Sequence, residues 1–500
     1  MHSFFLWDFL YSFPGWGRVG WGDFILVAEI SFIKNFATIK YLINFYSIIL
    51  SMNITQEFDT IAAISTPIGT GGVGVIRISG AESFDIIAKI SDKKTFPVGK
   101  ICHGWILDGD AKIDEVIILP FKNPNSYTGE DVIEIQCHGG INVVRNILDV
   151  VLKNGARMAE RGEFTKRAFL NKKLDLSQAE AVDDLIHAKT SKFALQSAKN
   201  LSGVLGVKIS EIKSKIFEVT SRIVAGIDFP EDVAEPEYDY LIDRFKESLD
   251  EIDKILSCAK SSDIMRQGIK VAIVGRPNVG KSSLFNALLN LDRAIVTDIA
   301  GTTRDVIKEN IDLGVSVTLI DTAGIRESCD VDKVEEIGIE YSKQSARESD
   351  LNIFLYDASS GLTDEDKEIY DIVKDMPHIV AANKSDLISG KEFGEVFEGT
   401  VKISTYTKDG LDELKSKMKK YVCEISPEDT EFVTNKRQQT CLIRSKEALQ
   451  NALAAAERNE LQDMIYIDLK AALLALDEIT GEVITDEILN NIFDHFCIGK

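Results

Sequence analysis

The chain has 500 residues, of which 45% are hydrophobic and 27% charged, and its net charge is -22. The length favours three or four domains, and the composition excludes a disordered or fibrous protein. An acidic chain repels nucleic acid on average, so action on RNA requires a local basic patch or a basic partner. Six cations form a candidate patch, whose density in an acidic chain favours anion contact over a solvated face: Arg157, Arg161, Lys166, Arg167, Lys172 and Lys173.

The seven cysteines are scattered and odd in number, and no CxxC pair occurs. This usage is typical of a reducing cytoplasm and excludes a disulfide framework.

Residues 1–51 are rich in Phe, Trp, Tyr and Ile. Charged residues interrupt each apolar run before it reaches the roughly 18 to 20 residues that a membrane span needs. The segment also lacks the pattern of a signal peptide. We expect the working chain to start at Met52, with the preceding residues a start-site artefact or a disordered arm. A membrane-attaching aromatic arm is the alternative.

The mixed strand and helix pattern of residues 52–172 predicts an α+β domain. Strands are expected at 60–64, 73–78, 114–119 and 131–136, and helices at 81–90 and 141–154. The glycines at 69–74 match the dinucleotide fingerprint G-x-G-x-x-G, but a strand follows them where a helix is required. They therefore predict a tight turn with close backbone approach.

Residues 173–265 and 425–500 have helical patterns. Ser177 and Glu180 have the spacing of a capping box, and residues 217–227 and 240–256 continue the helical pattern. Neither segment has a wide enough core alone, so the two are predicted to pack on each other. The compact block between them, residues 266–424, is then a domain inserted into a helical domain.

A phosphate-binding loop, Gly-Arg-Pro-Asn-Val-Gly-Lys-Ser, occupies residues 275–282. An apolar run at 269–274 predicts the strand before it, and the helix after it points its amino terminus at the phosphates. Lys281 is expected to reach the β- and γ-phosphates, and the Ser282 hydroxyl to bind Mg²⁺.

Further motifs narrow the ligand to GTP. Asp321 follows a predicted strand and is placed to bind the Mg²⁺ shell, and Gly324 can contact the γ-phosphate. Asp386, after the strand at 379–382, can accept hydrogen bonds from guanine N1–H and the 2-amino group, a pair of donors that adenine lacks. Thr303, in a switch loop, is the expected second Mg²⁺ ligand.

Two assignments stay open from the residues alone. The segment from Ser404 to Tyr406 either cradles the guanine or is an ordinary Ser/Thr-rich loop. Ile325 stands where many small GTPases carry a water-orienting Gln, and Glu335 is either its replacement or an exposed carboxylate.

Four segments together carry a family resemblance: 71–80 (GGVGVIRISG), 125–131 (NSYTGED), 162–171 (GEFTKRAFLN) and 497–500 (CIGK). Over residues 53–500 the chain closely resembles the MnmE (TrmE) family of tRNA modification GTPases. Two departures are Arg161, where the family usually has Pro, and Thr405-Tyr406, where it has Ala-Lys after Ser404.

The resemblance implies Mg²⁺- and K⁺-dependent GTP hydrolysis with dimerisation of the GTPase domains, the Mg²⁺ ligands being Ser282 and Thr303. It implies that Glu335 orients water and that K⁺ binds Asn278, Thr297, Ile299 and Thr302. The GTP contacts taken together are Asn278, Val279, Gly280, Lys281, Ser282, Ser283, Thr297, Asp298, Ile299, Ala300, Gly301, Thr302, Thr303, Asp321, Thr322, Ala323, Gly324, Asn383, Lys384, Asp386 and Ser404.

The resemblance also implies that the amino-terminal domain binds 5,10-methylene- or 5-formyl-tetrahydrofolate through Arg77, Glu130, Lys173 and Lys500. Cys497 matches a functionally important terminal cysteine. Family members form homodimers and act with an FAD-dependent partner of the MnmG family, as a heterotetramer. In the cytoplasm, and without a membrane, they add an aminomethyl or carboxymethylaminomethyl group to C5 of the wobble uridine of tRNA. A GTPase that binds ribosomal RNA during ribosome assembly is the alternative that the GTPase motifs alone leave open.

Overall fold

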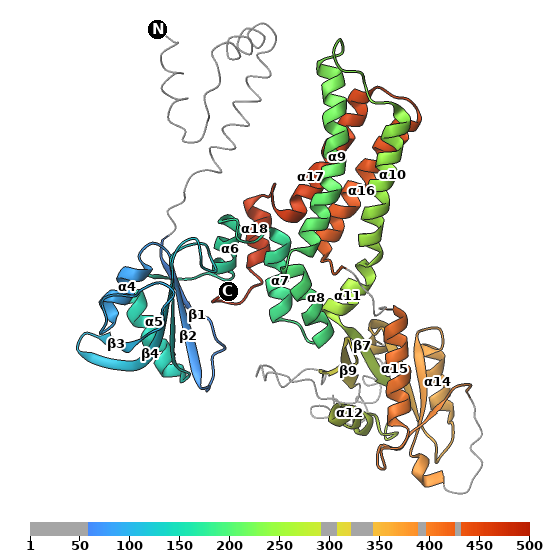
Figure 1. Cartoon of the computed structure of the whole chain (residues 1–500). Coiled ribbons are helices and arrows are strands. Elements are labelled where there is room, and N and C mark those ends of the chain that lie inside the picture. The colour runs from blue at the N-terminus through green and yellow to red at the C-terminus, as the bar shows by residue number, and fades with distance from the viewer. Residues whose placement is uncertain (1–58, 292–307, 322–343, 389–396, 426–431) are drawn as a thin grey trace, which may run out of the picture. The chain divides into compact units, whose positions relative to one another are not determined.

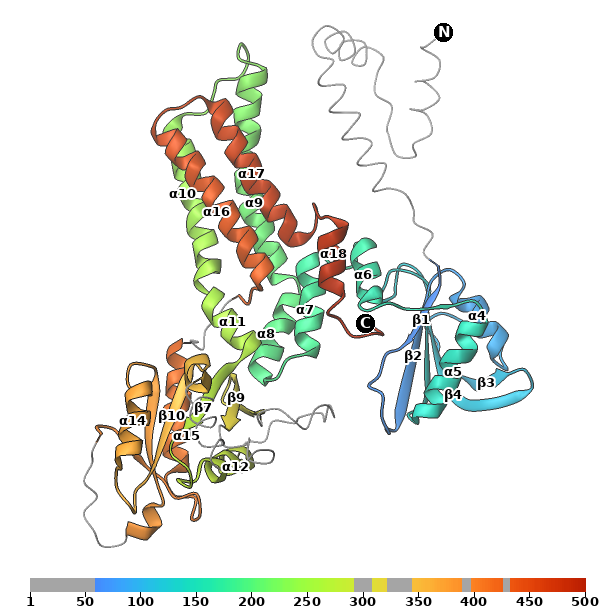
Figure 2. The ribbon, with the colours of Figure 1, turned by 180° about the vertical axis from the view of Figure 1, so that it is seen from behind.

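The computed structural model describes residues 59–291, 308–321, 344–388, 397–425 and 432–500. Figures 1 and 2 show its ribbon from opposite sides. No helix in these described ranges is long and apolar enough to cross a membrane. The predictions for residues 1–51 and Met52 lie outside the described residues.

A six-stranded sheet, in the order β3-β4-β5-β2-β1-β6, organises the first part of the chain. All neighbouring strands are antiparallel except β1 and β6. Helices α4 and α5 contribute buried residues to the core on this sheet. The elements are β1 (Ile61–Ile64), β2 (Val73–Ser79), α4 (Ser83–Ile90), β3 (Cys102–Asp108), β4 (Ala111–Phe121), β5 (Val132–His138), α5 (Ile141–Lys153), β6 (Arg157–Met158) and α6 (Glu163–Leu170).

The four predicted strands are present, and the sequence pattern missed two. Strand β3 contains His103 and Gly104, which break the apolar alternation, and its pairing with β4 supplies its register. The glycine-rich stretch leads directly into β2, as predicted. The Gly71 N–H donates to the Gly139 carbonyl at 3.1 Å, and a Cβ on Gly139 would lie 2.5 Å from the Gly71 oxygen. The close backbone approach is therefore confirmed.

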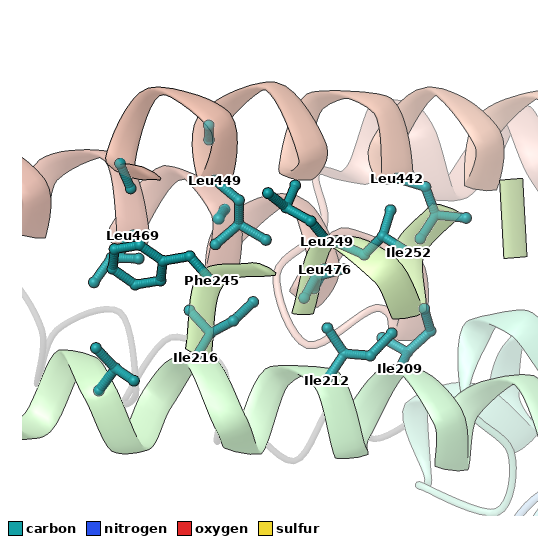
Figure 3. Packing of buried hydrophobic residues seen from close by; sticks show 14 of the residues in the cluster. Ile209, Ile212, Ile216, Phe245, Leu249, Ile252, Leu442, Leu449, Leu469 and Leu476 are labelled. Carbon is teal, nitrogen blue, oxygen red and sulfur yellow. The ribbon is translucent and has the colours of Figure 1, made fainter. Parts of the chain in front are cut away.

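Helices from two separate segments, one before residue 256 and one after residue 431, share one hydrophobic core, which Figure 3 shows from close by. Ile212 and Ile216 come from α9, Phe245 from α10, Leu449 from α16 and Leu469 from α17. A buried side chain of this size contributes about 1.5–3 kcal/mol, so the two segments stabilise each other. The helices are α7 (Leu176–Ile186), α8 (Ser191–Leu201), α9 (Val204–Asp228), α10 (Tyr238–Ser257), α11 (Ala259–Gln267), α16 (Lys436–Glu457), α17 (Gln462–Thr480) and α18 (Asp486–Phe493).

The capping box of α7 differs from the predicted one. The N-cap is Asp175, which accepts from the Gln178 N–H at 2.8 Å, while Gln178 Oε1 accepts from the Asp175 N–H at 2.9 Å. The prediction of Ser177 and Glu180 was wrong by two residues. Ser177 instead donates its hydroxyl to Asp175, and Glu180 is buried.

A second six-stranded sheet, in the order β12-β11-β10-β7-β9-β8, lies between the two helical segments in sequence. Its strands are parallel except for β8, so the carboxyl ends of β7, β9 and β11 lie at one edge. The elements are β7 (Ile269–Val274), α12 (Lys281–Leu291), β8 (Lys308–Asp312), β9 (Ser316–Asp321), β10 (Leu351–Asp357), α14 (Asp364–Val373), β11 (His378–Asn383), η1 (Ser385–Ile388), β12 (Val401–Lys402) and α15 (Leu411–Ile425). The three strands predicted before the nucleotide motifs are confirmed.

Candidate functional site

The loop between β7 and α12 has the backbone that phosphate binding requires. Asn278 and Gly280 have φ angles of 64° and 102°, in the left-handed region that turns successive N–H groups inward. Lys281 Nζ donates to the Gly275 carbonyl at 2.7 Å and to the Arg276 carbonyl at 3.0 Å. The loop thus holds an ammonium group at the amino terminus of α12, where an anion is favoured.

Asn383 joins three separate segments. Its Nδ2 donates to the Val279 carbonyl at 2.8 Å, and its Oδ1 accepts from the Thr405 N–H at 3.2 Å. The residue is 1% exposed, so both hydrogen bonds are shielded from water and strongly favoured. Asn383 therefore connects the phosphate loop, the end of β11 and the segment after β12.

Asp386 lies beside the segment whose role the sequence left open. Ser404 is fully buried, and its hydroxyl donates to Asp386 Oδ1 at 2.6 Å. Tyr406, by contrast, is 88% exposed. Ser404 thus holds this segment against the Asp386 carboxylate.

Lys384 is positioned by a neighbouring strand. Its Nζ lies 2.7 Å from Asp357 Oδ2, at the end of β10. Burial opposes ionisation of this carboxyl, but hydrogen bonds from Lys384 and Ser359 hold the pKa of Asp357 below its ordinary value. The carboxylate fixes the lysine stem at the edge of the site.

Several predicted contacts fall outside the described residues: Thr297, Asp298, Ile299, Ala300, Gly301, Thr302, Thr303, Thr322, Ala323, Gly324 and Glu335. Strand β9 ends at Asp321, as predicted. Ser282 and Ser283 are exposed in the first turn of α12.

A second cluster of charged residues lies on the first sheet. Arg77 donates from Nε to Glu134 Oε1 at 2.9 Å, and its guanidinium lies over the rings of Tyr127, at 4.9 Å, and Phe164, at 5.6 Å. Its Nη1 is buried, and none of the described residues is a hydrogen-bond partner of this atom. A buried donor without a partner is costly, so this corner fits an anionic or acceptor group of a ligand.

Glu130 contacts β2 at Ser79, two residues after Arg77. It accepts from the Ser79 hydroxyl at 2.6 Å and lies 3.2 Å from Nη1 of Arg167. Arg167 is only 1% exposed and also pairs with Glu163 at 2.9 Å. Arg157 pairs with Glu163 as well, at 2.7 Å. Arg167 of the predicted basic patch is therefore an internal ion-pair partner and not part of an anion-binding surface, whereas Arg157 pairs with Glu163 but stays exposed.

The last residues of the sequence pack against this cluster. The Lys500 carbonyl accepts from the Phe164 N–H at 3.2 Å, and the Gly499 carbonyl from the Ser65 hydroxyl at 3.2 Å. Burial and the nearby charge of Arg77 lower the pKa of the Lys500 ammonium. The structure therefore brings Lys500 to Arg77 across more than 400 residues of sequence. Lys173 is more exposed, and its Nζ donates to the Pro124 carbonyl at 3.0 Å.

Two family profiles match the chain: "MnmE helical domain" over residues 176–497 and "GTP-binding protein TrmE N-terminus" over residues 60–173. The tRNA modification GTPase MnmE of Thermoanaerobacter pseudethanolicus is 46% identical over 460 residues, which cover 89% of this chain and 100% of that protein. The chain belongs to the MnmE family. The relative from Caldicellulosiruptor saccharolyticus is 45% identical over 466 residues, 89% of this chain and all of that protein. Among solved structures, the chain is similar to Aquifex aeolicus Era bound to GDP·AlF₄⁻, with 34% identity, coverage of 36% of this chain and 66% of that chain, and a TM-score of 0.26.

In this MnmE-family chain, sequence reasoning missed two supporting residues. Arg167 was read only as part of a basic run, although its spacing of four from Glu163 is that of a helical ion pair. His187, a single histidine after α7, carried no motif. The structure places its Nε2 3.8 Å from the sulfur of Cys497, which is exposed.

Proposed function

We propose that this protein hydrolyses GTP as a component of an enzyme that modifies the wobble uridine of tRNA. The observation that carries the guanine assignment is the pair of contacts made by Asn383 and Ser404, which join the phosphate loop to the Asp386 carboxylate. The family membership supports the tRNA assignment, because the similar proteins are named tRNA modification GTPases.

The residues present fit Mg²⁺-GTP. Lys281 provides the charge for the β- and γ-phosphates, and the exposed hydroxyl of Ser282 at the start of α12 provides a ligand for Mg²⁺. We propose Thr303 as the second Mg²⁺ ligand and Glu335 as the residue that orients the attacking water. Asn278, Thr297, Ile299 and Thr302 are the proposed K⁺ ligands, and that cation supplies charge at the phosphates when the GTPase domains dimerise.

We propose the domain limits 52–172, 173–265, 266–424 and 425–500, with the GTPase domain inserted into the helical domain. The shared core of α9, α10, α16 and α17 supports the insertion, because its residues precede 256 or follow 431. The core of the second sheet draws instead on residues 269–422.

We propose that the cluster around Arg77 binds a one-carbon tetrahydrofolate. The unpaired Nη1 of Arg77 and the nearby Lys500 suit the glutamyl carboxylates of the cofactor, while Glu130 can accept from pterin N–H groups. The bound cofactor supplies the carbon that reaches uridine. Lys173 is proposed as a further cation at the exposed rim.

The net charge of -22 favours a partner that brings the basic surface for tRNA. We propose an FAD-dependent protein of the MnmG family in this role. The two proteins would form a heterotetramer in the cytoplasm.

Deletion of the gene in its host, followed by mass analysis of tRNA nucleosides, tests the proposal. We expect the modified wobble uridine to disappear and to return with the wild-type gene but not with Asp386→Asn. Normal uridine modification combined with defective ribosomal subunits would replace this function with the ribosome-assembly alternative.

A further inference from the structure

Cys497 contacts an imidazole from a distant part of the chain. Its sulfur lies 3.8 Å from Nε2 of His187, although 310 residues separate the two. The Cys497 backbone is fixed, because its carbonyl accepts from the N–H groups of Gly162 and Lys500, both at 3.4 Å. The side chain is nevertheless exposed. The structure therefore presents a held thiol that solutes can reach.

The other ring nitrogen of His187 defines its tautomer. Nδ1 lies 3.0 Å from the Asp183 carbonyl oxygen and 3.1 Å from Asp183 Oδ1. Both atoms are acceptors, so a neutral ring carries its proton on Nδ1 and has a lone pair on Nε2. The thiol is then the donor in its contact with His187.

We propose that His187 accepts the thiol proton and makes Cys497 a thiolate nucleophile, with Asp183 as the residue that positions the imidazole. The S–H bond breaks, the proton moves to Nε2, and the electron pair stays on sulfur. The imidazolium that forms is stabilised by the Asp183 carboxylate, as in other thiol–imidazole pairs. This inference deepens the proposed function, because Cys497 is adjacent to the proposed folate cluster.

The surrounding charges are consistent with this role. Burial raises the pKa of Asp183, and the charges of His187, Arg266 and His495 oppose that rise. Lys500 also interacts with the charges of Cys497 and Arg77. A thiolate at Cys497 thus has an imidazolium and an ammonium group to interact with.

Alkylation of the full chain by iodoacetamide tests the proposal without tRNA, folate or GTP, so the result is separable from the proposed function. The sulfur displaces iodide and forms an S–C bond, and peptide mass spectrometry follows each cysteine separately. Cys423, half-buried in α15, is the reference thiol in the same molecule. A free thiol with a pKa of about 8.5 is only a few per cent ionised at pH 7.

At about pH 7 we expect His187→Asn to slow alkylation of Cys497 about tenfold and Asp183→Asn to slow it less. The Cys423 rate should stay the same. Near pH 9.5 the wild-type and His187→Asn rates at Cys497 should converge, because at that pH an ordinary thiol ionises without the help of a base. The control His495→Asn, which removes the other nearby imidazole, should change the rate less than about twofold.

Equal rates at Cys497 in the wild-type and His187→Asn proteins at pH 7 would overturn the proposal. So would a slow rate in the variant that persists at pH 9.5, since that result indicates lost access to the sulfur. Circular dichroism of each variant verifies the fold. Where His187→Asn does not fold, the Asp183→Asn rate and the pH profile of the wild-type protein decide the question.

Discussion

The guanidinium of Arg437 binds both carboxylate oxygens of Glu180, each at 2.7 Å, across 257 residues of sequence. Arg437 is in the first turn of α16, the helix that follows α15 along the chain, and Glu180 lies on α7. Arg266, near the end of α11 and just before β7, pairs with Asp184, which also lies on α7. Helix α7 is therefore bonded to the chain segments that precede and follow the second sheet in sequence, and it also carries Asp183, the partner of His187.

Arg437→Ala should reduce the free energy of unfolding by about 3–5 kcal/mol, because it leaves the Glu180 carboxylate buried without its partner. Arg437→Lys should also destabilise, since an ammonium lacks the two-point geometry of the guanidinium. Urea denaturation followed by circular dichroism measures both. The matched control is Arg444→Ala, whose pair with Glu478 at 2.7 Å is half-exposed, and its expected effect is within about 1 kcal/mol. Equal losses in Arg437→Ala and Arg444→Ala would refute the importance of the buried pair.

Asp184 should make stability depend on pH. Burial raises the pKa of its carboxyl from 3.8 to about 6, and the Arg266 charge opposes the rise. The folded state therefore binds more protons than the unfolded state between these values. The protonated Asp184 carboxyl therefore contributes to the free energy of unfolding. This contribution is fully present below about pH 4 and is lost as the pH rises through about 6, at up to about 1.4 kcal/mol per pH unit.

Urea unfolding of the wild-type and Asp184→Asn proteins from about pH 4.5 to 6.5 measures this effect. The stability difference, wild type minus variant, should decrease as the pH rises. Parallel curves over that range would show that Asp184 does not titrate there.

Asp386→Asn should weaken GTP binding by about 10- to 100-fold, because hydrogen bonds to a charged acceptor contribute about 1.5–3 kcal/mol. An amide at this position can donate to the 2-oxo group of xanthine, so affinity for xanthosine triphosphate should increase. Fluorescent nucleotide titration measures both constants. Asp409→Asn, which changes an exposed carboxylate in the next loop, should leave both constants unchanged. Unaltered GTP affinity in Asp386→Asn would remove this residue from the guanine site.

Replacing K⁺ with Na⁺ should lower the rate of GTP hydrolysis at least about tenfold, because the proposed cation supplies charge at the transferring phosphate. Asn278→Gly keeps the left-handed backbone, with φ of 64°, and removes the side-chain oxygen. In a phosphate-release assay, we expect the rates of GTP hydrolysis in K⁺ and in Na⁺ to differ much less for this variant than for the wild-type protein. Equal wild-type rates in both salts would contradict the potassium assignment.

Gly499→Ala should displace the last residues of the sequence. Its φ is 94°, and a Cβ would lie 2.2 Å from the Ile64 carbonyl oxygen. With Lys500 moved away from Arg77, tetrahydrofolate affinity should fall about tenfold, as expected for one charged hydrogen bond, while GTP hydrolysis stays the same. Gly109→Ala is the matched control, because its φ is also positive, at 61°, but no atom of the part of the chain that the structure describes lies within 4 Å of the added carbon. Calorimetric titration with 5-formyl-tetrahydrofolate distinguishes the two variants, and unchanged affinity in Gly499→Ala would separate the tail from the proposed pocket.

The sequence alone determined the elements whose signal is local. Apolar runs and phosphate-loop spacing predicted β7, β9 and β11, and the strand after the glycines excluded a dinucleotide site. The capping box of α7 was misplaced because Asp175 and Ser177 both fit a cap locally, and only the backbone geometry selects one.

Tertiary structure alone decided the contacts between residues far apart in sequence. The sequence around His187 does not indicate that its ring contacts the Cys497 thiol, and the sequence around Glu180 does not indicate its ion pair with Arg437. Periodicity and motif spacing report only on neighbours within a few turns or strands. A contact across hundreds of residues depends on how the helices and sheets pack, because packing determines which side chains become buried together.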